Sequence, residues 1–208
     1  MLLKCNNLKE PFKPDFRNHL TEDFFIQPAE IVAKELLGTI LIKKEESDTI
    51  AGVIVETEAY LHQNDMSSHS YVGLTNRNKA MFERGGILYV YRSYGIHHCI
   101  NIVTEDKGIG SAVLIRAIEP IFGIDIMMRH RGISDRAKLC KGPGNLSKAF
   151  NFTIEDNFTK ITTPYLFIQK NADYSNNQIF QTKRIGISKS VELELRFYLK
   201  NSIFISRK

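Results

Sequence analysis

Apolar and polar residues alternate along several short stretches of the chain, which is the pattern of half-buried β-strands. The first two stretches, residues 39–43 and 52–60, flank a charged turn over residues 44–49, so a hairpin is the simplest connection between them. The same pattern predicts further strands over residues 87–91, 97–104, 111–118, 164–169 and 195–198.

Helical spacing of apolar residues occurs in fewer places. Pro28 stands in the first turn of a short amphipathic helix whose apolar residues run from Ile31 to Leu37 and which ends at Gly38. Helices are also expected over residues 78–82, 120–129 and 143–150, and a polar surface loop over residues 170–183. Strands and helices follow one another in mixed order rather than in regular alternation. The predicted fold class is therefore α+β, a single domain with a largely antiparallel sheet.

Length and composition limit the organisation of the chain. It has 208 residues, 43% of them hydrophobic, which is enough for one compact domain with its own core. We expect that domain over residues 21–208, after an N-terminal extension of residues 1–20. Three cysteines, an odd number far apart in the sequence, argue against a disulfide framework. Because no stretch approaches about 18 consecutive apolar residues, we expect a soluble, cytoplasmic protein with no membrane segment.

The charge balance adds little by itself. The net charge of +5 and a pI near 9.0 are compatible with a polyanionic partner such as a nucleic acid. They are equally typical of an ordinary, mildly basic protein, and charge alone favours that simpler interpretation.

The strand over residues 52–60 carries the first candidate chemistry. Its alternation places Glu56, Glu58 and Tyr60 on one face, opposite a strongly apolar face. An edge strand with one solvated face would explain this segment equally well, since charged residues are mostly exposed. Asp65 and His69 follow directly, however, and all these titratable groups could share a cleft.

Two further strands carry polar residues among apolar ones. Arg116 lies in a strand that is otherwise apolar on both faces, so its guanidinium should be partly buried and needs an acceptor. A structural salt bridge to Glu56 or Glu119 and a role in binding a phosphate or a water both remain open. Asn101 is ambiguous in the same way.

An aromatic residue in a predicted turn is the third candidate. Tyr94 follows the strand over residues 87–91, and Gly95 allows a tight turn there. Such tyrosines are often half-buried packing residues, but flat exposed rings also stack on nucleic-acid bases.

Candidate ligand sites are weaker. Gly142-Pro143-Gly144 before a helix is a feasible phosphate contact, although an ordinary helix start explains it as well. His69 with Glu56, Glu58 or Asp65 is the one cluster to consider for a metal, and its spacing matches no standard ligand pattern. We therefore expect no metal.

The ordered motifs together are more specific than any single residue. The chain resembles the alkyladenine (3-methyladenine) DNA glycosylase family over nearly its whole length beyond the first twenty residues. The motifs that carry the resemblance are Val55-Glu56-Thr57-Glu58-Ala59-Tyr60-Leu61, His69-Ser70, Arg77-Asn78, Met81-Phe82, Leu88-Tyr89-Val90-Tyr91, Tyr94-Gly95, Asn101-Ile102, Leu114-Ile115-Arg116-Ala117-Ile118-Glu119-Pro120, Leu139-Cys140-Lys141-Gly142-Pro143, Arg184-Ile185-Gly186-Ile187 and Leu195-Arg196-Phe197-Tyr198. Asn76 stands where this family often has proline, and Ile203-Phe204 where a Pro-Trp pair is common.

The resemblance implies a role for each matching residue. Glu58 would activate a water that Arg116 helps to hold, and Tyr94 would enter the base stack in place of the flipped nucleotide. The remaining residues of the implied site would bind the extruded base: Tyr60, His69 and Tyr91 around its ring and Asn101 at the pocket wall.

The resemblance also implies the reaction and the partner. The chain would be a monofunctional glycosylase that flips an alkylated or deaminated purine out of double-stranded DNA and hydrolyses its glycosidic bond. It would use no cofactor, no metal and no covalent enzyme intermediate, on a curved, largely antiparallel sheet flanked by helices. We expect a monomer. The competing hypotheses are a non-catalytic damaged-DNA binding protein, and a metal-dependent phosphoesterase that uses Glu56, Glu58 and His69.

Overall fold

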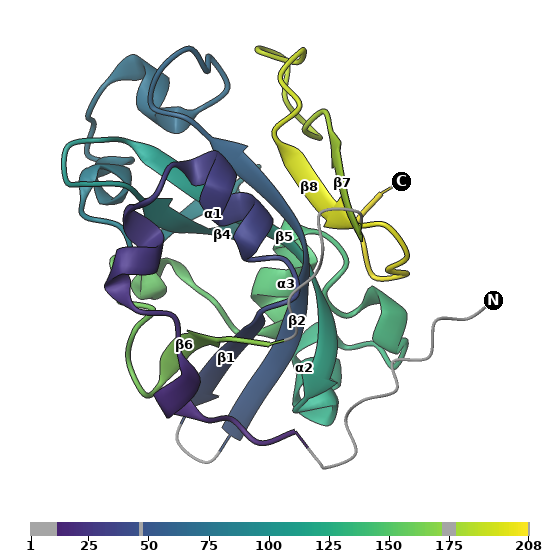
Figure 1. Ribbon diagram of the computed structural model, residues 1–208. Helices are drawn as coiled ribbons and strands as arrows, with labels where there is room; N and C mark the ends of the chain where they lie inside the picture. The colour runs from purple at the N-terminus through teal and green to yellow at the C-terminus, as the bar shows by residue number, and fades with distance from the viewer. Residues whose placement is uncertain (1–11, 46–47, 172–177, 208) are drawn as a thin grey trace.

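The computed structural model of the chain describes residues 12–45, 48–171 and 178–207. Within these residues, eight strands form one open antiparallel sheet against which three α-helices pack (Figure 1). The strand order is β3-β4-β5-β2-β1-β6, with β8 beside β2 and β7 beside β8. The predicted α+β fold is thus confirmed. The strands are β1 (Ile40–Glu45), β2 (Asp48–Tyr60), β3 (Leu88–Ser93), β4 (His97–Thr104), β5 (Ser111–Phe122), β6 (Leu166–Gln169), β7 (Ile179–Thr182) and β8 (Arg196–Leu199). The helices are α1 (Ala29–Glu35), α2 (Ile124–Arg131) and α3 (Pro143–Ala149).

The sequence patterns located most of these elements, but three predictions were wrong in detail. Strand β5 runs on through Pro120, where a helix was expected, because Pro120 pairs with Gly52 at a shift in the strand register. Helix α2 begins only after Gly123, which has a left-handed φ of 69°. Residues 79–82 form a 3-10 turn rather than an α-helix. The expected surface loop over residues 170–183 contains strand β7, and residues 172–177 of that prediction lie outside the described part.

Strand β2 is the longest strand and organises the sheet around it. One of its edges pairs with β5, and the other pairs with β1 along its first half and with β8 along its second half. Helix α1 covers one face, where the Thr57 hydroxyl donates to the Ala33 carbonyl at 2.8 Å. Both faces are buried, and Glu56 and Glu58 have no exposed surface. The interpretation of this segment as an edge strand with a solvated face is therefore wrong.

The register between β2 and β5 shifts on both sides of Glu56. A shift of this kind is a β-bulge, which locally increases the twist and re-aims side chains, and bulges are frequent next to active sites. Here the irregularity lies beside Glu56 and Arg116, two residues that the sequence analysis selected as candidates.

The segment before the first strand also contacts the sheet. The Asp15 N–H donates to the Gln169 side chain at 2.8 Å, and the rings of Phe16 and Phe167 meet edge to face. The domain boundary at residue 20 stays a prediction.

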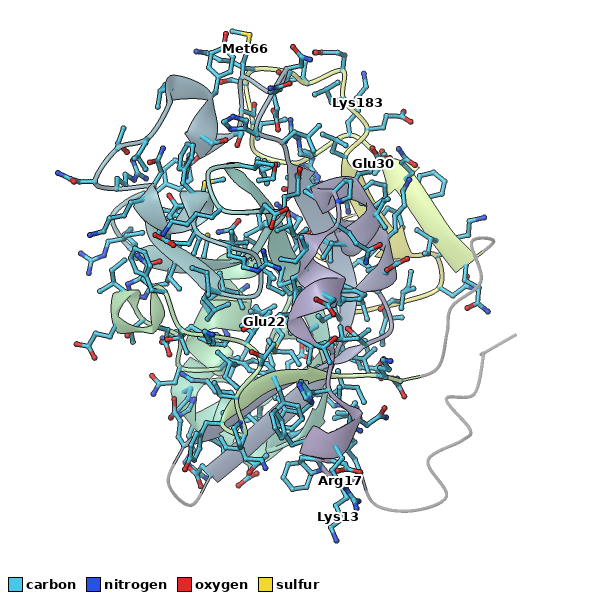
Figure 2. All side chains as sticks on the ribbon, turned by 60° about the vertical axis from the view of Figure 1, so that its left-hand side comes forward. Lys13, Arg17, Glu22, Glu30, Met66 and Lys183 are labelled. Atoms are coloured by element: carbon cyan, nitrogen blue, oxygen red, sulfur yellow. The ribbon has the colours of Figure 1, made fainter. Side chains whose placement is uncertain are left out.

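Lys13 and Arg17 lie at one end of the molecule and Met66 at the other (Figure 2). Among the described residues, no helix has the length and apolar character needed to cross a membrane.

Candidate active site

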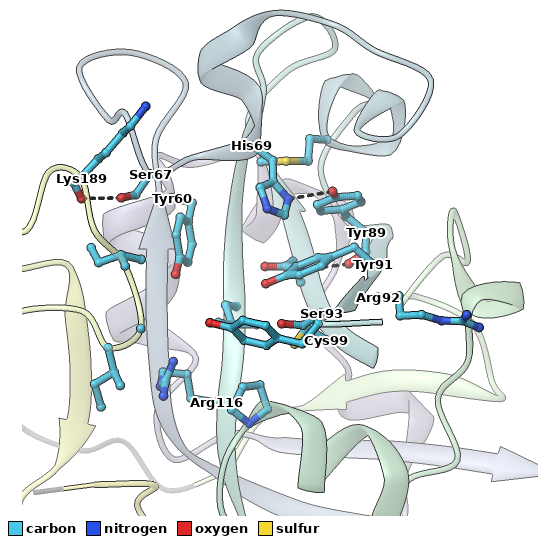
Figure 3. Close-up of a pocket in the computed structure, with 18 of the residues that line it drawn as sticks. Tyr60, Ser67, His69, Tyr89, Tyr91, Arg92, Ser93, Cys99, Arg116 and Lys189 are labelled. Atoms are coloured by element: carbon cyan, nitrogen blue, oxygen red, sulfur yellow. Dashed lines mark hydrogen bonds between the residues drawn. The ribbon is translucent and has the colours of Figure 1, made fainter. Parts of the chain in front are cut away.

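A cavity of about 570 Å³ lies between β2, β3, β4 and the loop that precedes β8 (Figure 3). Figure 3 shows the ring of Tyr60 on one side of this cavity and the rings of His69 and Tyr91 on the other. All but one of the predicted site residues line it: Tyr60, His69, Tyr91, Tyr94, Asn101 and Arg116. The exception, Glu58, lies directly behind the wall, in contact with Tyr60, Arg116 and Ile185.

Glu58 is held by donors on both carboxylate oxygens. Its Oε1 accepts the Ile185 N–H at 2.7 Å, and its Oε2 accepts the Tyr60 hydroxyl at 2.9 Å and Arg116 Nη1 at 3.1 Å. Burial raises the pKa of the Glu58 carboxyl above its usual range, while the Arg116 charge and the hydrogen bonds from Ile185 and Tyr60 oppose that rise. The same group is therefore deeply buried, oriented and close to a permanent cation.

Arg116 is buried, as its apolar strand predicted, and it joins both carboxylates of β2. Its Nε donates to Glu56 and its Nη1 to Glu58, each at 3.1 Å. The expected salt bridge to Glu56 is thus present, whereas Glu119 lies closer to Arg136, at 3.9 Å. Arg116 also contacts Glu58 at the cavity wall, where it could bind a water or a phosphate as the sequence analysis considered.

The two glutamates of β2 have different surroundings. Glu56 also accepts from Arg196 Nε at 2.7 Å and from the Ser206 hydroxyl at 2.8 Å, so the C-terminal segment covers it. With two guanidinium groups and a hydroxyl around it, Glu56 is a structural acceptor. Glu56 meets the cavity lining through Arg116, whereas Glu58 contacts Tyr60 and Ile185 of the lining as well as Arg116.

The aromatic wall consists of uncharged groups. His69 Nδ1 lies 2.9 Å from the Tyr89 hydroxyl, and burial, with Arg77 nearby, lowers the pKa of His69. Burial also raises the pKa of Tyr89 to about 12 and raises that of Tyr60 and of Tyr91. At neutral pH the cavity therefore presents neutral rings on both sides.

Two asparagines fix the positions of these rings. The Asn78 amide donates to the carbonyls of His69 and Gly73, both at 2.8 Å, and so closes the loop that carries His69. The Asn101 amide donates to the Tyr89 carbonyl at 3.1 Å. Asn101 is buried at the cavity wall, where the sequence analysis expected it.

Tyr94 projects from the turn between β3 and β4. It has a left-handed φ of 50°, Gly95 follows with 71°, and the Ile96 N–H closes the turn on the Ser93 carbonyl at 3.1 Å. Its side chain is 88% exposed. Large non-glycine residues rarely adopt a positive φ, and such strain gathers at functional sites. An exposed ring held in this way is available to a partner.

The sequence analysis gave no role to Arg184 and Ile185, which hold the wall behind Tyr60. Arg184 donates two hydrogen bonds of 2.6 Å to Asp65, and this pair is fully buried. Its guanidinium lies 4.6 Å from the centre of the Tyr60 ring. The next residue, Ile185, supplies the N–H that binds Glu58. The motif Arg184-Ile185-Gly186-Ile187 was visible in the sequence, but only the fold brings it to β2.

The cluster considered for a metal is not assembled. Asp65 pairs with Arg184, Glu56 with Arg116 and Arg196, and His69 with Tyr89. Within the described parts of the chain, no three His, Cys, Asp or Glu side chains are placed to hold a metal ion together.

Comparison with known proteins shows the family to which this chain belongs. The family model described as methylpurine-DNA glycosylase (MPG) matches residues 23–203, a range that includes the whole cavity wall. The chain belongs to the methylpurine-DNA glycosylase family. Members of this family are DNA glycosylases, so the chain is a hydrolase of DNA repair.

Curated relatives of this glycosylase match it almost end to end. A protein of Chlorobium phaeobacteroides is 45% identical over 190 residues, which are 91% of this chain and 96% of the relative. A protein of Methanoculleus marisnigri is 46% identical over 188 residues, with coverages of 89% and 97%. One from Francisella tularensis is 45% identical over 179 residues, with coverages of 85% and 92%. Each carries the name "Putative 3-methyladenine DNA glycosylase".

Proposed function

We propose that this glycosylase flips an alkylated or deaminated purine out of duplex DNA and hydrolyses its glycosidic bond with a water that Glu58 activates. The substrate class is that of 3-methyladenine, 7-methylguanine and hypoxanthine. The names of the relatives support the first of these bases. The cavity supports a flipped base, because flipped nucleotides are bound in snug pockets and stacked between aromatic side chains.

The main support for the proposal is the number of hydrogen-bond donors around the Glu58 carboxylate. A carboxylate offers about four acceptor positions on its two oxygens. Three donors occupy Glu58: the Ile185 N–H, the Tyr60 hydroxyl and Arg116. One position is left for a water, and deprotonating that water would place a nucleophile next to a sugar that develops positive charge.

Access of that water depends on Tyr60. Glu58 has no exposed surface, and the Tyr60 hydroxyl is hydrogen-bonded to it on the side of the cavity. A water that reaches the free acceptor position of Glu58 therefore has to pass the ring of Tyr60.

The walls suit a cationic base. Alkylation gives a purine a positive charge, and a cation over the face of an aromatic ring is stabilised by about 0.5–2 kcal/mol. His69, whose pKa is lowered by burial, is neutral at pH 7 and adds no repulsion. A neutral base such as hypoxanthine gains less from these rings and needs protonation or hydrogen bonding as it leaves.

The product test decides the reaction class. We expect an intact DNA strand that bears an abasic site, formed equally well in EDTA. Strand cleavage by a glycosylase ordinarily requires an amine that forms a Schiff base with the sugar. Lys189 lines the base cavity, but Figure 3 shows its ammonium group directed away from the ring of Tyr60. On a denaturing gel, the lesion strand should break only after alkali.

A matched variant separates water from Lys189 as the nucleophile. Lys189→Ala should release the base at nearly the wild-type rate, and borohydride should trap no enzyme–DNA adduct. An adduct that disappears in Lys189→Ala, or strand scission without alkali, would refute hydrolysis by water. Strand scission that EDTA abolishes would instead support the metal-dependent phosphoesterase.

Tyr94→Ser should weaken flipping. Extruding a base costs a few kcal/mol of stacking, and an inserted ring offsets part of this. We expect excision from duplex DNA to fall by about tenfold or more, with a smaller loss on a single-stranded lesion, which has no stack to refill. The control is Tyr165→Ser, which removes another exposed tyrosine, 71% accessible, from the far end of the sheet. Equal losses of Tyr94→Ser on both substrates would count against a wedge.

A further inference from the structure

A second hollow, of about 300 Å³, lies beside the turn that carries Tyr94. Strand β4, the end of α2, helix α3 and the segment after α3 form its walls. Its polar lining consists of His97, His98, His130, Lys148, Asn151 and Thr153. Three imidazoles and an ammonium group thus converge on one small space, and none of the residues that line it is acidic.

Two of these groups lack partners in the part of the chain that the structure describes. Within that part, His98 Nε2 is a buried nitrogen without a hydrogen-bond partner. A buried polar atom left in this way costs about 1–3 kcal/mol, which is explained when a ligand or a water supplies the partner. Lys148 is exposed and forms no ion pair with any residue that the structure describes. Glu45, which accepts a hydrogen bond from the Asn151 amide, is already paired with Lys43 at 2.6 Å.

The hollow is fixed in position relative to the turn. Helix α3 packs so tightly on β4 that a Cβ on Gly144 would lie 2.9 Å from the Cβ and Cγ atoms of His97. Ile96, between Tyr94 and His97 in the sequence, lines the hollow and is 76% exposed. A ligand in the hollow would therefore sit at a set distance from the exposed ring of Tyr94.

We propose that this hollow binds a phosphate group of the DNA backbone next to the lesion. The proposal rests on the proposed function, in which Tyr94 enters the base stack. A duplex that receives Tyr94 brings its backbone to the neighbouring surface, and phosphate contacts fix the register of a protein on DNA without reading its sequence. Lys148 supplies the charge, and His98 Nε2 and the Asn151 and Thr153 side chains supply hydrogen-bond donors.

The salt dependence of binding tests the charge. When the logarithm of the affinity is plotted against the logarithm of the salt concentration, each phosphate that the protein neutralises contributes about −0.9 to the slope. Lys148→Ala should reduce the slope for a lesion duplex by about this amount and weaken binding on the order of eightfold at 0.1 M salt. The single-turnover excision rate at saturating enzyme should not change. The control is Lys13→Ala, which removes the same charge from an exposed residue that does not line the hollow and should leave the slope unaltered.

Neutral methylphosphonate links, placed one at a time around the lesion, would locate the phosphate. In the wild type, a methylphosphonate at one position should weaken DNA binding. In Lys148→Ala, the methylphosphonate at that position should cause no further loss of affinity. His98→Phe keeps a ring of similar size without the nitrogens. It should bind the unmodified lesion duplex more weakly than the wild type does, and a methylphosphonate at the same position should weaken its binding less than in the wild type. A melting temperature near the wild type would show that this variant is folded.

The outcomes separate this proposal from the proposed function. A wild type that releases bases, with an unchanged salt slope and methylphosphonate profile in Lys148→Ala, overturns the phosphate site alone. A wild type that binds lesion DNA but releases no base refutes the proposed function, and a smaller salt slope in Lys148→Ala would then still support the phosphate contact. Equal slope changes in Lys148→Ala and Lys13→Ala would reduce the effect to overall charge, which also overturns the site.

Discussion

Glu58→Gln should slow base release by about a thousandfold, the scale of general base catalysis by a positioned side chain. Glutamine keeps the size of the residue but has no basic lone pair for the water. Its NH₂ group would also face one of the donors that Glu58 now accepts from, Ile185, Tyr60 or Arg116. Single-turnover release of 7-methylguanine measures the effect, while binding to lesion DNA should change by only a small factor.

Glu56→Gln is the matched control in the same strand. Glu56 is bound by Arg116, Arg196 and Ser206, and it contacts neither Tyr60 nor Ile185 at the wall of the cavity. We therefore expect a loss of stability, with a release rate per folded molecule near that of the wild type. A normal rate in Glu58→Gln would show that Glu58 is not the base, and equal rate losses in both variants would point to a structural effect.

The pH profile of the wild type should reflect the buried state of Glu58. Burial raises the pKa of this carboxyl, and only its ionised form can take a proton from water. Release should therefore decline as the pH falls through this raised pKa, above the usual range of a glutamate. A profile that stays flat down to about pH 4 would contradict the assignment of the base.

Arg116→Gln should have the second large effect, on stability as well as on activity. Removing one partner of a buried ion pair leaves an uncompensated charge and costs about 3–5 kcal/mol. Glu56 keeps Arg196 and Ser206 in this variant, so Glu58 is the carboxylate that loses its cation. Urea unfolding would measure the free energy of unfolding, and release per folded molecule would measure the chemistry. Arg116→Lys is the variant to use if Arg116→Gln does not fold.

The loss of folding stability in Arg116→Gln should depend on pH, and its direction follows from the pKa of Glu58. Without Arg116, the pKa of Glu58 rises further in the folded state, so the folded variant takes up a proton more readily than the unfolded chain. Its stability then falls as the pH rises through that pKa, and the deficit against the wild type should be larger at about pH 8 than at about pH 5. The control, Arg129→Gln, removes an exposed arginine that lies 3.2 Å from Asp125 and should cost about 0–1 kcal/mol. A similar small cost for Arg116→Gln would show that the buried network does not hold the site.

The sequence by itself determined most of the strands, and six of the seven site residues selected from it line the cavity. Alternation has a period of two, so the pattern of residues 52–60 alone indicates which side chains share a face. Gly95 after Tyr94 indicated the turn, and an arginine within an apolar strand indicated burial of Arg116. These features are local, and local pattern is enough to predict them.

Only the tertiary structure decided what surrounds each of these residues. Alternation could not show that both faces of β2 are covered, because α1 covers one face and the segments that carry Ile185 and Ser206, far away in the sequence, cover the other. Pro120 indicated a helix, but pairing with Gly52 kept it in the sheet. The Asp65–Arg184 pair joins residues 119 positions apart, and the hollow beside Tyr94 draws on two helices and a strand. Such contacts depend on how the chain folds back on itself, which no single stretch of sequence specifies.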